Sequence, residues 1–133
     1  MTRSQTVLLV DDDQEIVNGA KLRLRAAGYD TVTAHDGEQG VATAIEIKPD
    51  VIVLDVRMPN KDGLQALQEL KHHEVTHNIP IIMLSASLVD QQRALDAGAR
   101  FFLTKPYAGK NLLGAIESAL GERRRCMQHG TSS

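Results

Sequence analysis

Three adjacent carboxylates carry the first chemical signal in this sequence. Asp11, Asp12 and Asp13 directly follow the apolar run VLLV, and a helix-like pattern begins immediately after them. Like charges a few ångströms apart repel by roughly 4 kcal/mol per pair at an effective dielectric constant near 20, so the cluster needs a counter-charge. A hard divalent cation such as Mg²⁺ would supply it, because this ion takes oxygen ligands.

Other reactive side chains follow three further apolar runs. Asp55 comes after VIVL, Ser85 after IIML, and Lys105 shortly after FFL. A carboxylate beside bound Mg²⁺ can attack phosphorus and form an aspartyl phosphate. A lysine can neutralise the oxygens of the transferring group, which is where most catalysis of phosphoryl transfer arises. Brought together, these residues would form a set suited to phosphate and cation chemistry.

The elements that must position these residues alternate along the chain. Between the apolar runs lie longer segments in which apolar residues recur every three or four positions, and several of these segments close with glycine. The runs predicted as strands are 7–10, 31–34, 51–54, 81–84 and 101–103. Strict strand–helix alternation predicts a parallel sheet covered by helices on both faces. Functional groups then gather beyond the carboxyl ends of the strands.

Bulk composition excludes several other classes of protein. The 133 residues suffice for one domain, expected at 1–121, and the polar, basic residues 122–133 are expected to form a tail. A net charge of -2 and scarce aromatic residues argue against nucleic acid or an anionic membrane as the main partner. The single cysteine, Cys126, and the absence of a long apolar run indicate a cytoplasmic domain.

Taken together, these motifs resemble the receiver domain of two-component response regulators. The resemblance covers about residues 6–120 and is carried by LLVDDD, VLDVRMPNKDG, IIMLSAS, AGA and FFLTKPY, in the order and spacing of that family. It implies a doubly wound, flavodoxin-like (βα)5 fold of the α/β class, with strand order 2-1-3-4-5. It also implies a phosphorylation-dependent switch rather than an enzyme. A sensor histidine kinase or a histidine phosphotransfer protein would supply the phosphoryl group.

The resemblance assigns a role to each site residue by its position. Asp55 would accept the phosphoryl group, and Lys105 would bind its oxygens. Ser85 matches the switch hydroxyl, and Phe102 matches the aromatic side chain that moves with it. The matching Mg²⁺ ligands are Asp12, Asp55 and the backbone carbonyl of Arg57, with Asp11 acting through water. Asp13 is expected to cap the following helix instead.

The resemblance also predicts how the switch would work. On phosphorylation Ser85 would turn inward, Phe102 would fill the vacated space, and the face of the fourth helix, fifth strand and fifth helix would change its affinity for an unidentified downstream protein. Arg57 and Ser87 occupy positions that tune dephosphorylation in the family. Phosphorylation-dependent dimerisation stays open, because Arg100 and Phe101 replace acids that many DNA-binding members use in dimer contacts.

Three alternatives remain at this point. The chain would fit equally well as a receiver from a longer protein, such as a hybrid histidine kinase or a regulator with an output domain. Asp11 and Asp13 have the D-x-D spacing of haloacid-dehalogenase-like phosphatases, with Asp11 as nucleophile, although Glu15 stands where that family has Thr or Val. An unphosphorylated scaffold is the third, and the complete set of acids and lysine argues against it.

Overall fold

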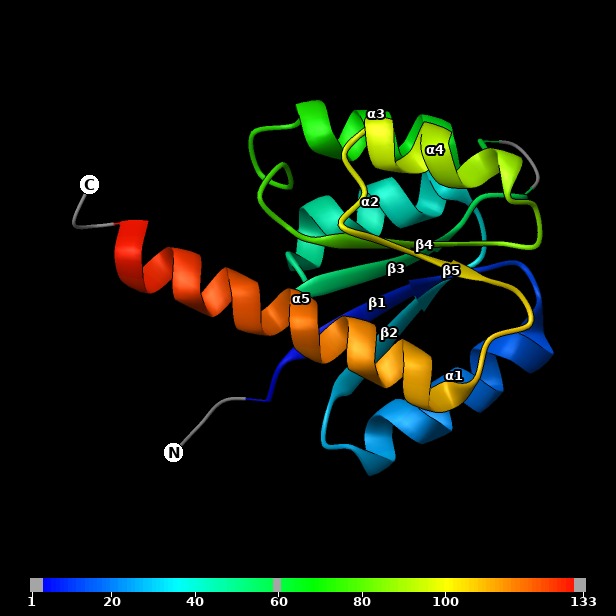
Figure 1. The fold of residues 1–133 in the computed structure, drawn as a ribbon, viewed down its shortest axis with the longest axis horizontal. Coiled ribbons are helices and arrows are strands. Elements are labelled where there is room, and N and C mark those ends of the chain that lie inside the picture. The colour runs from blue at the N-terminus through cyan, green and yellow to red at the C-terminus, as the bar shows by residue number, and fades with distance from the viewer. Residues whose placement is uncertain (1–3, 59–60, 131–133) are drawn as a thin grey trace.

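A computed structural model describes residues 4–58 and 61–130 of the chain (Figure 1). Within these residues strands and helices alternate, as the apolar pattern predicts. The strands are β1 (Thr6–Val10), β2 (Asp30–Ala34), β3 (Val51–Asp55), β4 (Ile81–Ser85) and β5 (Phe101–Thr104). The helices are α1 (Gln14–Ala26), α2 (Gly37–Ile47), α3 (Gly63–His72), α4 (Val89–Asp96) and α5 (Gly109–Gly130). Each predicted strand is present, and β3 and β4 extend far enough to include Asp55 and Ser85.

The strands form one parallel sheet in the order β2-β1-β3-β4-β5. This order confirms the predicted doubly wound, flavodoxin-like α/β fold. Asp55 lies opposite Leu84 across β3 and β4, and Ser85 lies opposite Thr104 across β4 and β5. The carboxyl ends of these strands therefore finish nearly level with one another, at one edge of the sheet.

Helices cover both faces of the sheet, with α1 and α5 on one face and α2, α3 and α4 on the other (Figure 1). Along β1, Val7 and Leu9 pack into the core shared with α1 and α5. Leu8 and Val10 pack into the core on the opposite face. Because strands of this kind are buried on both sides, their sequences read as unbroken apolar runs rather than as alternating ones.

Aspartates start three of the helices. Asp13 Oδ1 accepts hydrogen bonds from the backbone N–H of Glu15 at 3.0 Å and of Ile16 at 3.3 Å, which confirms the predicted cap of α1. Asp36 caps α2 in the same way, and Asp62 caps α3. The capping role occupies Asp13, so the three adjacent acids do not act as one group.

Glycines mark some helix ends but not the last one. Gly28 and Gly98 have φ values of 95° and 108°, in the left-handed region that favours glycine. The expected end of the domain at residue 121 does not coincide with a helix end, because α5 continues through Gly121 to Gly130. A glycine inside a helix costs only about 1 kcal/mol, and the Glu and Arg residues that follow are good helix formers. Whether 122–133 forms a distinct tail stays a prediction. No helix in the described part of the chain is long and apolar enough to cross a membrane.

Candidate functional site

The predicted site residues converge at the carboxyl edge of the sheet. Asp11 directly follows β1, Asp55 ends β3, Ser85 ends β4, and Lys105 directly follows β5. These positions are far apart in sequence, and Lys105 and Asp11 are separated by 94 residues. Parallel pairing of β1, β3, β4 and β5 brings the four side chains to one edge of the sheet.

Lys105 lies between two buried carboxylates. Its Nζ is 3.1 Å from Asp11 Oδ2 and 3.1 Å from Asp55 Oδ1. Asp11 and Asp55 are only 3% and 4% exposed, so their attraction to the ammonium group is poorly screened by water. Lys105 therefore supplies the counter-charge that a cluster of acids at this edge requires. A second cation would find oxygen ligands on the same two residues.

The electrostatic environment sets the protonation of Asp55. Burial and the nearby charge of Asp11 raise the pKa of Asp55 to about 6, against the opposing attraction of Lys105. Burial alone would lower the pKa of Lys105, but Asp55 and Asp11 reverse that effect and the pKa is raised. Lys105 is thus a permanent cation at neutral pH, whereas Asp55 takes up a proton under mildly acidic conditions.

Three carboxylates are close enough together to hold a metal ion. Asp11, Asp12 and Asp55 each offer an oxygen, and these oxygens lie within 4.8 Å of one another. Asp12 is exposed, so a hydrated ion can approach from solvent. An all-oxygen, acidic donor set fits Mg²⁺, which commonly keeps part of its water shell in proteins. Arg57, whose carbonyl is the fourth predicted ligand, follows Asp55 by two residues, and its role as a ligand stays a prediction.

Ser85 is held by a residue that the sequence analysis missed. Its Oγ donates a 2.7 Å hydrogen bond to Asp90 Oδ2, and both residues are 1% exposed. Asp90 in turn accepts hydrogen bonds from the guanidinium group of Arg57. Acids are common in the first turn of a helix, where they interact favourably with the helix dipole, so nothing in the sequence distinguishes Asp90. Only the packing of α4 against β4 identifies it.

Phe102 lies in β5, opposite Met83 of β4. It is partly buried and packs against the core on the α2–α4 face of the sheet. Ser85 ends β4, two residues after Met83, so the predicted hydroxyl and aromatic residues sit on adjacent strands. Their coupled movement stays a prediction.

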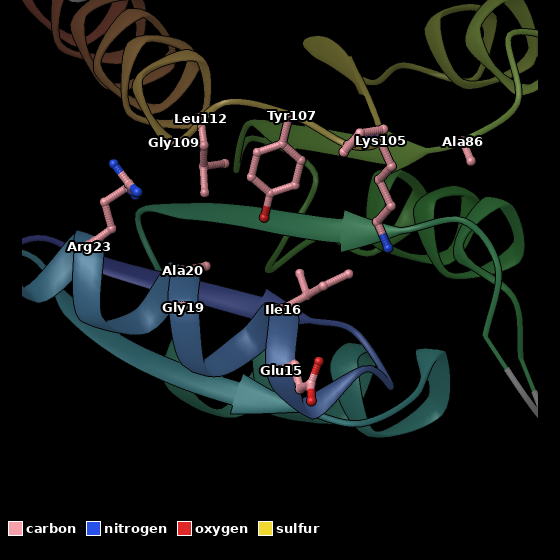
Figure 2. Close-up of a pocket in the computed structure, with 11 residues that line it drawn as sticks. Glu15, Ile16, Gly19, Ala20, Arg23, Ala86, Lys105, Tyr107, Gly109 and Leu112 are labelled. Atoms are coloured by element: carbon pink, nitrogen blue, oxygen red, sulfur yellow. The ribbon is translucent and has the colours of Figure 1, made fainter.

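A groove adjoins the acidic cluster. It has a volume of about 430 Å³ and runs between α1 and the segment that joins β5 to α5. Ile16 and Ala20 line it from α1, and Leu112 from α5 (Figure 2). Tyr107 projects into the groove, and Lys105 stands at one end of it (Figure 2). The peptide bond between Lys105 and Pro106 is cis, an isomer that the sequence left open.

Comparison with known sequences gives consistent matches. The family model for the response regulator receiver domain matches residues 7–117. The DNA-binding dual master transcriptional regulator RpaA of Synechocystis sp. is 36% identical over 124 residues, which are 92% of this chain and 52% of that protein. The transcriptional regulatory protein CpxR of Klebsiella pneumoniae is 40% identical over 86% of this chain and 48% of that protein. The chain thus spans about half the length of these curated relatives.

Solved structures match over most of their own length. A putative response regulator from Chloroflexus aurantiacus superposes with a TM-score of 0.86 at 30% identity, covering 90% of this chain and 99% of that one. The chemotaxis protein CheY4 of Vibrio cholerae has a TM-score of 0.82 at 32% identity, covering 89% and 100%. The receiver domain of the sensor histidine kinase PA1611 from Pseudomonas aeruginosa has a TM-score of 0.83 at 31% identity, covering 90% and 99%, and it holds a magnesium ion in its active site cleft.

Proposed function

The chain belongs to the response regulator receiver domain family of two-component systems, and on that premise we propose that it is a signalling switch with Asp55 as its phosphoryl acceptor. One observation carries this proposal. Asp55 ends the central strand β3 as a buried carboxylate, touches the Lys105 ammonium group and shares the acidic cluster with Asp11 and Asp12. Asp11 makes the same contact with Lys105, but Asp55 ends the central strand β3, which lies between β1, followed by Asp11, and β4, which ends at Ser85.

The chain's own residues support a phosphoryl transfer step. A carboxylate oxygen of Asp55 attacks the phosphorus of a phosphohistidine on a sensor kinase or a histidine phosphotransfer protein. The new O–P bond forms as the N–P bond breaks, and the imidazole nitrogen keeps the electron pair of that bond. Lys105 neutralises the negative charge on the phosphoryl oxygens, which is the main contribution a protein makes to this chemistry. Asp55 must be deprotonated to act.

The metal requirement is part of the same proposal. Asp11, Asp12, Asp55 and the backbone carbonyl of Arg57 would hold Mg²⁺. When bound, the ion would neutralise the clustered carboxylates and stabilise charge on the phosphoryl oxygens. The all-oxygen donor set supports this, as does the magnesium ion in the matched Pseudomonas aeruginosa receiver domain.

The output of the switch would lie on the α4–β5–α5 face. Three large apolar side chains of this region are solvent-exposed: Leu88 at 67%, Val89 at 72% and Leu95 at 39%. Exposed apolar groups of this size suit contact with another protein. We therefore place binding of a downstream partner, or of a second phosphorylated copy, on this face. DNA binding is a named property of RpaA, and the alternative that this chain is the receiver portion of such a longer regulator remains.

The test is intact-mass spectrometry after incubation with acetyl phosphate and MgCl₂. Wild type is expected to gain one phosphoryl group, and Asp55→Asn is expected to gain none. Asp96→Asn, which removes an exposed carboxylate from α4, serves as the matched control and should be labelled like wild type.

The same experiment separates the rival functions. Labelling that persists in Asp55→Asn but is lost in Asp11→Asn would place the nucleophile after β1, as in a phosphatase. An unlabelled wild-type protein would contradict the switch and favour a scaffold.

A further inference from the structure

The hydroxyl proton of Ser85 already takes part in a hydrogen bond to Asp90 in this structure. Ser85 Oγ donates to Asp90 Oδ2 at 2.7 Å and accepts from the backbone N–H of Ser87 at 3.1 Å. Hydrogen bonds from a hydroxyl to a carboxylate are short and are stronger than those between neutral groups. A serine has only one proton to donate. Ser85 therefore cannot donate to Asp90 and to a second anion at the same time.

Asp90 is unusual because it is a carboxylate buried to 1% exposure. Arg57 compensates its charge, with Nε 3.2 Å from Oδ2 and Nη2 3.3 Å from Oδ1. The Arg57 side chain is itself 70% exposed, so the cation keeps most of its contact with water. Removal of Asp90 would therefore leave no buried charge without a partner. This matters for any substitution at this position, because orphaned buried charges are what usually make such changes destructive.

The Asp90 contacts connect three parts of the site. Arg57 belongs to the segment just after Asp55, Ser85 ends β4, and Asp90 lies in the first turn of α4. Because Asp55 lies opposite Leu84, Ser85 is one residue further along the strand adjacent to the acceptor. A phosphoryl group on Asp55 would place strong acceptor oxygens at this same edge. Ser85 would then have two anions competing for its proton.

We propose that Asp90 is a positioning residue. It holds the Ser85 hydroxyl away from the phosphoryl group and thereby lowers the affinity of the site for that group. The proposal rests on the phosphoryl acceptor role of Asp55. In the unphosphorylated protein Asp90 holds Ser85. Phosphorylation must break this hydrogen bond before Ser85 can reach the new oxygens. Because Asp90 lies on α4, the broken bond also removes one of the contacts that hold the first turn of this helix, which carries the exposed Val89.

This competition predicts the effect of removing Asp90. In Asp90→Ala the Ser85 hydroxyl is free to donate its hydrogen bond to the phosphoryl group, so a phosphoryl analogue should bind more tightly. We expect an increase of about tenfold, the lower end of what one hydrogen bond to a charged group contributes, because the freed hydroxyl must still leave water. Asp90→Asn keeps an acceptor oxygen without the charge and should fall between wild type and Asp90→Ala.

The experiment measures the dissociation constant of beryllofluoride, a phosphoryl analogue that binds to a carboxylate oxygen. The ion is titrated into the full chain in the presence of MgCl₂ and followed by fluorine NMR. The variants are Asp90→Ala, Ser85→Ala and the double variant. If Asp90 acts through Ser85, Asp90→Ala tightens binding only where Ser85 is present, and it has no effect in the Ser85→Ala background.

The controls separate this role from a merely structural one. Asp96→Ala removes an exposed carboxylate from the same helix and should leave the dissociation constant within about twofold of wild type, as expected for a solvated surface charge. An unchanged or weaker affinity in Asp90→Ala, or an equal gain in both backgrounds, would overturn the proposal. Should Asp90→Ala fail to fold, Asp90→Asn is carried through the same cycle with the same criteria.

If Asp55 is not the phosphoryl acceptor, the experiments give a result that differs from failure of the Asp90 proposal alone. If wild type neither binds beryllofluoride nor is labelled at Asp55 by acetyl phosphate, the switch itself is wrong and the role of Asp90 falls with it. If wild type binds and is labelled while Asp90→Ala behaves identically, only the Asp90 proposal is wrong.

Discussion

Asp55 is less stable as a carboxylate in the folded chain than in water. Its pKa of about 6 exceeds the ordinary value of 3.8, because burial and Asp11 together outweigh the attraction of Lys105. The native protein therefore binds more protons than the unfolded chain between about pH 4 and about pH 6, and its free energy of unfolding decreases as the pH rises through that window. Above it, the ionised Asp55 opposes folding.

This sign leads to a prediction for the metal-free protein. In EDTA at about pH 7.5, Asp55→Asn should be more stable than wild type by roughly 1–3 kcal/mol, and the difference should shrink at about pH 4. Urea unfolding followed by circular dichroism measures both values. Asp96→Asn is the control, with no comparable pH dependence expected. A stability difference that is the same at both pH values would contradict the raised pKa.

Individual site residues differed in how well the sequence could reveal them. Asp11, Asp55 and Ser85 stand directly after apolar runs and Lys105 shortly after one, so the parallel-sheet pattern alone brought them together. Asp90 stands within a helix, five residues after Ser85, and its burial depends on how α4 packs. No periodicity in the sequence encodes that contact. The same is true of the contact between the Arg57 side chain and Asp90, which the sequence did not indicate.

Alanine substitutions at two helical glycines show whether close packing against the sheet limits the stability of a helix. An added Cβ at Gly114 of α5 would meet no atom within 4 Å, whereas one at Gly40 of α2 would lie 2.9 Å from Val10 Cγ1. Gly114→Ala should therefore stabilise the chain by about 1 kcal/mol through helix propensity. Gly40→Ala should destabilise it by roughly 1–3 kcal/mol, because α2 must move away from β1.

Thermal and urea unfolding of Gly114→Ala and Gly40→Ala measure the change in the free energy of unfolding for each variant. The two substitutions are chemically identical, so opposite signs can only come from packing. A gain in stability at Gly40 would show that α2 does not depend on close approach to Val10.

The elements were easier to predict than their ends. Unbroken apolar runs located the central strands β1, β3 and β4, because double burial removes polar residues from them. The residue at which a helix ends depends on smaller free energies than those gained by burying a strand. The turn at Gly28 needs a left-handed residue, whereas Gly121 lies within α5, where a glycine costs only about 1 kcal/mol. A glycine in the sequence does not distinguish these two situations.

The native sheet as a whole creates the predicted cation site. Only folding brings oxygens of Asp11, Asp12 and Asp55 within 4.8 Å of one another, so Mg²⁺ should bind the native state and not the unfolded chain. Such binding raises the free energy of unfolding by about 2.7 kcal/mol when the free ion is at 100 times its dissociation constant. We therefore expect MgCl₂ to raise the unfolding temperature of wild type.

Asp12→Asn should lose most of this increase, because it removes an exposed ligand without disturbing the core. Differential scanning calorimetry with KCl at matched ionic strength distinguishes specific binding from screening. An equal increase in wild type and Asp12→Asn would mean that the ion binds elsewhere.

Asp11 and Lys105 lie 94 positions apart in the sequence, which has a consequence for how the site forms during synthesis. During synthesis Asp11 after β1 and Asp55 at the end of β3 emerge before Lys105, which follows β5. An incomplete chain therefore carries these acids without the lysine that balances their charge. If Asp55 is the phosphoryl acceptor, the complete site forms only after Lys105, which follows the last strand, has been synthesised. On the proposed function, a chain truncated before Lys105 would carry the acids without their counter-charge and would compete poorly with complete molecules for phosphoryl groups.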